Sequence, residues 1–350
     1  MKLMEGIIFY CLNQLNGERT IYSIYHLFKG KKSSQTIQDA HLYGIKNYFG
    51  VYHSFTRELL EESIRTAFDQ GLLKQAGDQR FILSGHGKSE LETFLNNNHI
   101  LAWLNGWKYQ QTGLFWERLS LLVQVVSNLV KGETSYLPIQ KNKDVHQWLK
   151  QFLRTSGYPR DVIGQKLYGE LVACLDNREA PDPLILVVRL TGSRQIGLTP
   201  LQAADTLQLD KSSYQIEFIT ILHYMIRQLT ENPEVYPLLS RLAADFNPNQ
   251  LLTLSASRTQ LLIHQGFSLE EIASIRGLKI STIEDHVVEI ALNDEQFPID
   301  HYIEKSIQEK ILTAARQDGS RQLKQIRNAV QTANYFEIRL VLAKYGVAQC

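Results

Sequence analysis

Cysteine is scarce in this sequence, and its three residues, Cys11, Cys174 and Cys350, lie far apart. They form no Cys-x-x-Cys pair, and the ten histidines are scattered. A zinc site and a disulfide framework both need several ligands or thiols at suitable spacing, so the sequence predicts neither. We therefore expect no metal and no cofactor. The cysteine content suits a reducing cytoplasm.

Long apolar runs are also missing. No stretch approaches the length of about 20 residues that a membrane-spanning helix needs, so no membrane contact is expected. The apolar run near the N-terminus is soon interrupted by Asn13, Gln14 and Asn16, and no small-residue cleavage site follows. We expect a first helix there and no signal peptide.

The sequence has little excess charge. Its 350 residues carry a formal net charge of +1, and 44% of them are hydrophobic. This length is enough for two or three domains, each with its own core. Without the global basic excess of many nucleic-acid binders, any DNA contact must come from local patches.

Catalytic motifs are absent as well. We find no Ser-His-Asp order, His-Glu-x-x-His, paired-carboxylate cleft or glycine-rich dinucleotide turn in a suitable context. His223 lies inside an apolar helical stretch and is interpreted as a satisfied core histidine, not as a ligand. The sequence thus predicts a protein that is not an enzyme and has no small-molecule substrate.

The most informative stretch is residues 268–292, which predicts two helices joined by a tight turn. Ser268 is a good N-cap for a first helix with acidic residues in its first turn. Gly277 then supplies a left-handed turn, and Ser281 or Thr282 is expected to cap the second helix. This pattern is typical of a helix-turn-helix, although a plain helical hairpin would share it.

Residues 1–95 predict helices followed by a β-hairpin, which is the order of elements in a winged helix. A basic, polar turn at residues 29–35 separates the second helix from the third. The turn is either a solvated loop or a contact to a phosphate backbone. The expected helices cover residues 6–15, 21–28, 36–42 and 55–70, and the expected strands cover residues 72–75 and 80–83 around the tip 76–79.

The rest of the chain predicts helices only, which gives a mainly α fold in three domains. Residues 1–95 would be the winged-helix-like domain, 96–250 a helical middle domain and 251–350 the helix-turn-helix domain. Expected middle helices cover residues 114–130, 145–153, 162–175, 184–190, 200 onward and 214–229. The apolar run at 184–190 is also compatible with a strand, although a helix is favoured. Beyond them we expect helices at residues 255–264, in the helix-turn-helix, and at 300–317, 320–331 and 335–345.

These residues resemble modules of RecQ-type DNA helicases. The C-terminal unit is similar to their helix-turn-helix module, and the N-terminal unit is similar to the winged-helix (RQC) domain that follows their motor. The first similarity rests on Thr259-Gln260-Leu261-Leu262, Gly266, Ser268-Leu269-Glu270-Glu271-Ile272-Ala273, Arg276-Gly277-Leu278, Ser281-Thr282-Ile283-Glu284, His286 and Ile338-Arg339-Leu340-Val341-Leu342-Ala343. The second rests on Leu27-Phe28-Lys29-Gly30, Ser34-Gln35-Thr36-Ile37, His41, Tyr48-Phe49-Gly50 and Leu72-Leu73 after Gly71.

The whole layout resembles the stand-alone YpbB family of bacterial helix-turn-helix proteins, whose expected partner is a RecQ-type helicase with a shortened C-terminus. The sequence departs from the helicases in two ways. No four-cysteine zinc subdomain is present, and the hairpin tip Ala76-Gly77-Asp78-Gln79 has no aromatic residue. Active strand separation by this hairpin is therefore not expected.

The resemblance implies a non-enzymatic accessory subunit that supplies DNA-binding domains in trans to a RecQ-type helicase, in DNA repair or recombination. Its DNA substrate would be a fork or junction, held mostly through phosphates. Two other functions stay open: a sequence-specific transcription regulator, and an interaction scaffold without DNA contact. The candidate DNA-binding residues are Lys29, Lys31, Lys32, Ser34, Gln35, Lys74, Arg80, Lys279, Ser281 and Thr282.

The charges of the second helix of the helix-turn-helix argue against insertion into a DNA groove. It carries Glu284, Asp285 and Glu289, which phosphates would repel. Only Lys279, Ser281 and Thr282 at its N-terminus are suited to a phosphate, where the helix dipole helps. Positive residues gather later, at Lys310, Arg316, Arg321, Lys324 and Arg327. We therefore expect the N-terminal winged helix to make the DNA contact.

Overall fold

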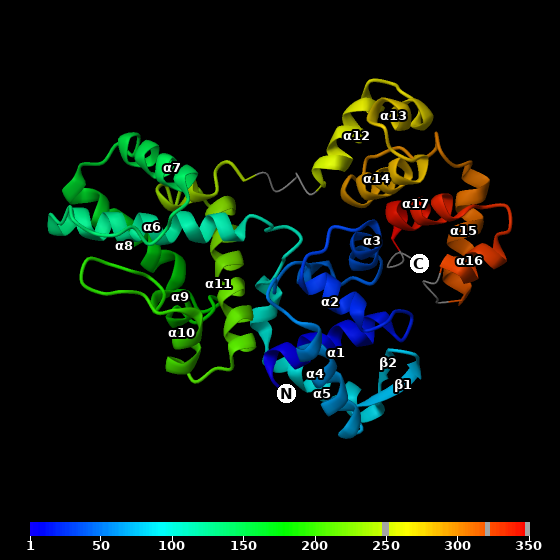
Figure 1. The fold of residues 1–350 in the computed structure, drawn as a ribbon, viewed down its shortest axis with the longest axis horizontal. Helices are drawn as coiled ribbons and strands as arrows, with labels where there is room; N and C mark the ends of the chain where they lie inside the picture. Colours follow the sequence, from blue (N-terminus) through cyan, green and yellow to red (C-terminus); the bar gives the residue numbers. More distant parts are fainter. Residues whose placement is uncertain (247–251, 319–322, 347–350) are drawn as a thin grey trace. The chain divides into compact units, whose positions relative to one another are not determined.

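The fold is mainly α-helical, with one two-stranded antiparallel hairpin, as the sequence predicts (Figure 1). The computed structural model describes residues 1–246, 252–318 and 323–346. The chain divides into two compact units. The middle unit comprises Met1–Ile7 and Glu90–Pro248, and the terminal unit comprises Ile8–Ser89 and Asn249–Cys350. The segments predicted as first and third domains thus pack into one unit, and the division into three domains stays a prediction.

The first segment of the terminal unit contains helices that lead into the hairpin. Ser33 and Thr56 cap α3 and α4 by accepting hydrogen bonds from backbone N–H groups. Gly71 follows α4 with a φ of +70°, a conformation that glycine adopts at little cost. The elements are α1 (Leu3–Leu15), α2 (Tyr22–Phe28), α3 (Ser34–Leu42), the 3-10 turn η1 (Lys46–Tyr48), α4 (Arg57–Asp69), β1 (Leu73–Gly77), β2 (Arg80–Leu83) and α5 (Gly85–Asn97). The division into units falls within α1 and α5, since residues 3–7 and 90–97 belong to the middle unit.

The middle unit is built around two long helices, α6 and α11, whose apolar faces meet in one core. Phe115, Leu119 and Ile221 of these helices are fully buried in it. His223 of α11 is 2% exposed, and its Nδ1 accepts the backbone N–H of Asn105 at 3.0 Å, so it is a satisfied core histidine as predicted. The elements are η2 (His99–Trp103), α6 (Thr112–Lys131), α7 (Lys143–Arg154), α8 (Arg160–Leu175), α9 (Leu184–Val187), α10 (Pro200–Thr206), α11 (Lys211–Glu231) and η3 (Leu239–Leu242).

The C-terminal segment of the terminal unit contains the predicted helix-turn-helix. Ser268 and Glu271 form a reciprocal capping box at the start of α13, and Gly277 ends that helix at a φ of +61°. The elements are α12 (Leu254–His264), α13 (Leu269–Arg276), α14 (Ile280–Asn293), α15 (Lys305–Asp318), α16 (Leu323–Ala329) and α17 (Tyr335–Tyr345).

Helix α14 is the centre of the terminal unit. It packs against α12, α13 and α17 from its own segment and against α3 from the N-terminal segment (Figure 1). Its residues from His286 to Ala291 are all buried. The helix-turn-helix and the N-terminal segment therefore pack together within one unit.

Several predicted boundaries are wrong. Helix α14 begins at Ile280 with Lys279 as N-cap and without a side-chain cap, so neither Ser281 nor Thr282 caps it. The apolar run at 184–190 forms only the four-residue helix α9, and α15 begins at Lys305, five residues later than expected. Helix α5 was not predicted. The start predicted for α16, at residue 320, lies outside the described residues.

Among the described residues, no helix is long and apolar enough to cross a membrane. In the same part of the chain, no cluster of three or more His, Cys, Asp or Glu residues could hold a metal ion.

Candidate nucleic-acid interface

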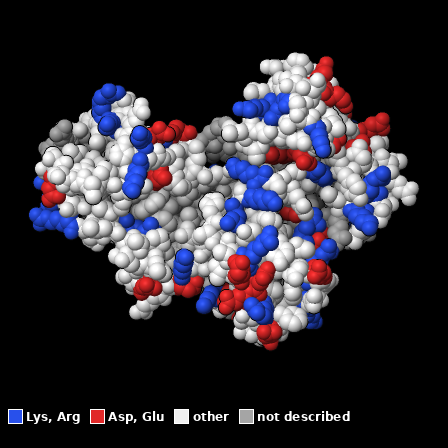
Figure 2. Space-filling model, in the orientation of Figure 1, with Lys and Arg blue, Asp and Glu red and all other residues white. Residues whose placement is uncertain are grey.

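The turn between α2 and α3 presents positive charge to solvent. Lys29, Lys31 and Lys32 are exposed, and so is Gln35 in the first turn of α3. Figure 2 shows Lys and Arg side chains gathered on this face where Figure 1 draws the connection between α2 and α3. The lysines have no ion-pair partner among the described residues, although the Lys29 ammonium lies 5.7 Å from the centre of the Tyr25 ring. The turn therefore offers unneutralised charge to a phosphate backbone.

A hollow of about 260 Å³ lies beside this turn. Two of the predicted residues, Lys31 and Gln35, line it. Its other polar walls come from Arg19, Thr20, Tyr22, Ser23, His26, Ser33, Thr36 and Asp39. Hydroxyl, amide and cationic groups converge here on the N-terminal end of α3, so the hollow is suited to a phosphate oxygen.

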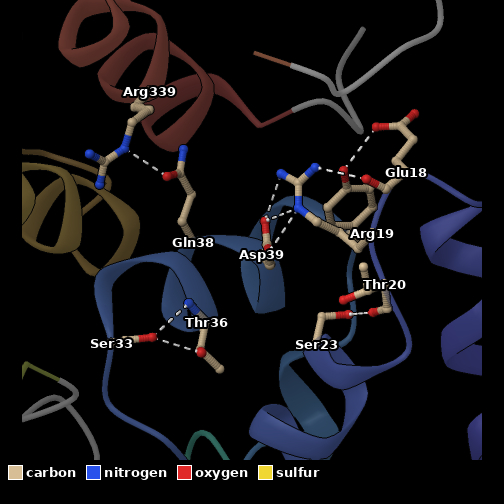
Figure 3. Close-up of polar contacts among 10 residues, drawn as sticks. Glu18, Arg19, Thr20, Ser23, Ser33, Thr36, Gln38, Asp39 and Arg339 are labelled. Atoms are coloured by element: carbon tan, nitrogen blue, oxygen red, sulfur yellow. Dashed lines mark hydrogen bonds and ion pairs between the residues drawn. The ribbon is translucent and has the colours of Figure 1, made fainter. Parts of the chain in front are cut away.

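One wall of the hollow is a fixed ion pair between Arg19 and Asp39. The Arg19 Nε lies 3.0 Å from Asp39 Oδ2, and its Nη2 donates to Oδ1 at the same distance (Figure 3). Burial raises the pKa of Asp39, while the hydrogen bonds from Arg19 act in the opposite direction. Because Arg19 is held by Asp39 and by the carbonyl of Glu18, it is a structural cation, and the free positive charge belongs to the lysines.

His26 also lines the hollow and responds to the positive potential of this site. Burial lowers its pKa, and the charges of Lys31 and Arg57 lower it further. An anion bound in the hollow would oppose this shift, because it would stabilise the imidazolium.

The hairpin carries the other predicted cations of this segment. Lys74 pairs with Ile82 and Arg80 with Gly77 in the antiparallel register, and both cationic side chains are exposed. The tip has no aromatic ring; instead Phe81 packs edge-to-face on Phe68 of α4 with ring centres 6.0 Å apart. The hairpin can therefore contact a backbone through charge, but it presents no ring at its tip for stacking on a base.

Helix α4, which directly precedes the hairpin, has an exposed face that is acidic on balance. Arg57 and Arg65 stand against Glu58, Glu61, Glu62 and Asp69, all of them exposed. Figure 2 shows Asp and Glu side chains gathered where Figure 1 draws α4. Entry of this helix into a DNA groove would bring carboxylates close to phosphates, which is electrostatically unfavourable.

The candidate residues at the start of α14 lie apart from its buried middle. Lys279 and Ser281 are exposed and Thr282 is half-buried. Further along the helix, Asp285 forms an ion pair with Arg339 at 2.6 Å, and Glu289 accepts hydrogen bonds from Thr253. Only the first turn of α14 is therefore open to a phosphate, and the rest is engaged in the core.

Arg339 of α17 joins the two segments of the terminal unit. Its Nε donates to Gln38 Oε1 at 2.8 Å (Figure 3). Its Nη2 donates to Ser34 Oγ at 3.1 Å. The Ser34 hydroxyl, one of the predicted DNA contacts, is thus engaged by a residue from the other end of the chain. The spacing of residues does not predict this contact, because the residues of the middle unit lie between the two segments in the sequence.

The later positive residues belong to α15 and α16. Lys310 and Lys324 are exposed, and the Arg327 guanidinium donates to the carbonyl of Gln331. Arg316 lies near the end of α15, and Arg321 lies outside the described residues. Sequence reasoning missed Arg19 and His26 as walls of the hollow, because neither stands in a recognisable motif.

Comparison with known proteins relates these features to a family. The sequence model of a helix-turn-helix domain matches residues 255–342. Protein YpbB of Bacillus subtilis (strain 168) is 36% identical over 338 residues, which cover 95% of this chain and 95% of that protein. No solved structure matches the chain. The C-terminal helix-turn-helix, a domain type common in DNA-binding proteins, is thus confirmed.

Proposed function

The chain belongs to the YpbB family, and from that premise we propose that it is a non-enzymatic, DNA-binding accessory partner of a RecQ-type DNA helicase. In this proposal it grips duplex phosphates near a fork or junction and acts in DNA repair or recombination, in the cytoplasm at the nucleoid. The observation that carries the DNA contact is the exposed, unpaired lysine turn between α2 and α3 beside a polar hollow.

The arrangement of charges favours contact with the DNA backbone over reading of bases. Both helices that could enter a groove are unsuited to it, since α4 has an acidic face and α14 is engaged in the core from His286 onward. Lysines on turns, by contrast, bind phosphates without regard to sequence. We therefore propose Lys29, Lys31, Lys32 and Gln35 as the main contacts, with Lys74 and Arg80 on the hairpin and Lys279, Ser281 and Thr282 at the start of α14.

The helicase partnership is supported by the similarity of the N-terminal and C-terminal segments to modules that RecQ-type helicases carry in their own chains. A helicase with a shortened C-terminus would lack these modules, and this chain would supply them. The test is purification of the tagged chain from its own cells, followed by identification of the proteins that copurify. Recovery of a RecQ-type helicase whose association with the chain persists after nuclease treatment supports the partnership. Failure to recover such a helicase would refute it.

The DNA contact has a direct test in the variant Lys31→Glu with Lys32→Glu. Reversal of two exposed charges is expected to weaken binding of a fluorescent forked duplex by roughly tenfold at low salt. The logarithmic dependence of affinity on salt should become shallower by about 0.9 for each phosphate that the variant no longer neutralises. Fluorescence anisotropy over a salt series measures both quantities.

The matched control is Lys88→Glu with Lys324→Glu, which changes the net charge equally at two other exposed positions of the terminal unit. It should bind as the parent does. Equal binding by the parent and the Lys31/Lys32 variant would show that the turn is only a solvated loop. Loss of binding in the control alone would move the contact toward α5 or α16.

A sequence-specific regulator is the second candidate, because the helix-turn-helix domain is common among such proteins. Specific sites usually exceed nonspecific ones in affinity by a thousandfold or more, roughly. Selection from random duplexes therefore separates the two functions. An enriched motif would favour the regulator, and preference for forks without sequence preference would favour the helicase partner.

A further inference from the structure

A second basic surface lies in the middle unit, on α7. Lys143, Gln147, Lys150 and Arg154 follow each other at intervals of four, three and four residues. This spacing aligns them along one face of a helix. All four are exposed, and Lys141 precedes them on the loop that leads into the helix. We name this set of five residues the α7 stripe.

The charge of the stripe is not neutralised locally. Residues 131–154 contain five Lys or Arg residues and only two acidic ones, Glu133 and Asp144. Within the described part of the chain, Lys141, Lys143 and Lys150 take part in no ion pair, and the Arg154 guanidinium donates to the neutral amide of Gln151. Figure 2 shows Lys and Arg side chains where Figure 1 draws α7.

The stripe borders two shallow hollows rather than a flat surface. Lys141, Lys143, His146, Gln147 and Lys150 line the first. The second is lined by Gln147, Trp148, Lys150, Gln151 and Arg154, so an indole ring lies among the cations. The ring is held in place, because Arg118 lies 4.8 Å from its centre and Phe152 packs against it.

We propose that the α7 stripe binds the backbone of single-stranded DNA. From Lys143 to Arg154 the stripe rises about 16 Å along the helix, which matches a short segment of one strand. A row of cations one side chain wide fits a single backbone, and amide and aromatic groups between the cations suit the bases of an unpaired strand. The middle unit thus holds the displaced strand of a fork.

This inference rests on the proposed DNA binding, and it assigns a different form of DNA to a different unit. The lysine turn of the terminal unit contacts duplex, and the α7 stripe contacts single strand. The stripe has four positive charges, so the salt dependence of single-strand binding should have a slope near −2.8, at about −0.7 for each phosphate contact.

The test measures two labelled ligands with the full-length chain: a blunt duplex, and an oligothymidylate of about 20 nucleotides, longer than the site of one binding module. Lys143→Glu with Lys150→Glu is expected to weaken oligothymidylate binding by about tenfold and to leave duplex binding unchanged. Lys31→Glu with Lys32→Glu should give the reverse pattern. Folding is not at risk, since Lys150 is exposed and a glutamate at position 143 suits the first turn of a helix.

Lys166→Glu with Lys211→Glu is the matched control, because both lysines are exposed in the same unit but lie on α8 and α11. Parental oligothymidylate binding in the α7 variant, or no such binding by the parent, would overturn the inference. Loss of binding in the control as well would show that binding depends on the overall charge of the unit and not on the α7 stripe. This result would also overturn the inference. In each of these outcomes the duplex measurement still decides the proposed function separately.

Discussion

Replacement of Glu170 by alanine is expected to destabilise the middle unit by about 3 kcal/mol, the largest effect of any single substitution considered. The Glu170 carboxylate on α8 is buried and accepts the backbone N–H of Leu238 at 3.0 Å and that of Leu239 at 2.8 Å. These two backbone groups are themselves buried at the start of η3. Alanine would leave both without an acceptor, and each loss costs about 1 to 3 kcal/mol.

The middle unit can be followed selectively during unfolding. All four tryptophans of the chain, Trp103, Trp107, Trp116 and Trp148, lie in it. Urea titration followed by tryptophan fluorescence should therefore show an earlier transition in Glu170→Ala. Glu170→Gln retains one acceptor and should lose less, and Tyr168→Ala on the same helix should lose little because Tyr168 is 71% exposed. A transition unchanged by Glu170→Ala would show that the contact contributes nothing.

Acidification is expected to destabilise each unit through a histidine whose pKa the fold lowers strongly. Burial lowers the pKa of His223 in the middle unit to about 3, and burial also lowers the pKa of His41 in the terminal unit to about 3. In the unfolded chain both groups titrate near 6.5. Below that pH the unfolded chain takes up a proton that the folded unit rejects, so stability is complete above pH 6.5 and falls as the pH decreases toward 3.

Below pH 6.5, each histidine is expected to lower the free energy of unfolding by about 1.4 kcal/mol for every pH unit. At pH 5 the middle unit and the terminal unit would therefore each be less stable by about 2 kcal/mol. Urea titrations at pH 7, 6 and 5 by tryptophan fluorescence measure it for the middle unit. His223→Gln removes the titrating group and should flatten this dependence. The same slope in the variant would mean that other groups govern the acid response.

Local structure could be predicted well from the sequence because its causes are local. The N-cap Ser268, the left-handed Gly277 and the hairpin each depend on a few neighbouring residues. The tip predicted at residues 76–79 is shorter in the structure, because β1 continues to Gly77. Apolar spacing gave α17 its bounds, Tyr335–Tyr345, correctly. The start of α14 was predicted wrongly because a capping side chain, Ser281 or Thr282, was expected there. The N-cap is instead Lys279, whose side chain offers no oxygen to accept a backbone N–H.

Contacts between distant segments could not be predicted in this way. Nothing in the spacing of residues indicates that Arg339 reaches Ser34 and Gln38, or that Arg19 holds Asp39 at the wall of the hollow. The spacing of the α7 stripe is present in the sequence, but apolar periodicity, which locates a helix, does not show which of its charges are exposed and unpaired. What makes it a candidate surface is the exposure of its charges, which only the structure provides.

The contact between α3 and α17 also sets an order of events during synthesis. Gln38 and Arg339 are 301 positions apart, and the whole middle unit is translated between them. A ribosome that adds 5 to 20 residues per second needs roughly 15 to 60 seconds for this distance. During that time the nascent chain carries α3 without the helices that cover it, so the middle unit can fold first and the terminal unit closes only when α14 and α17 emerge.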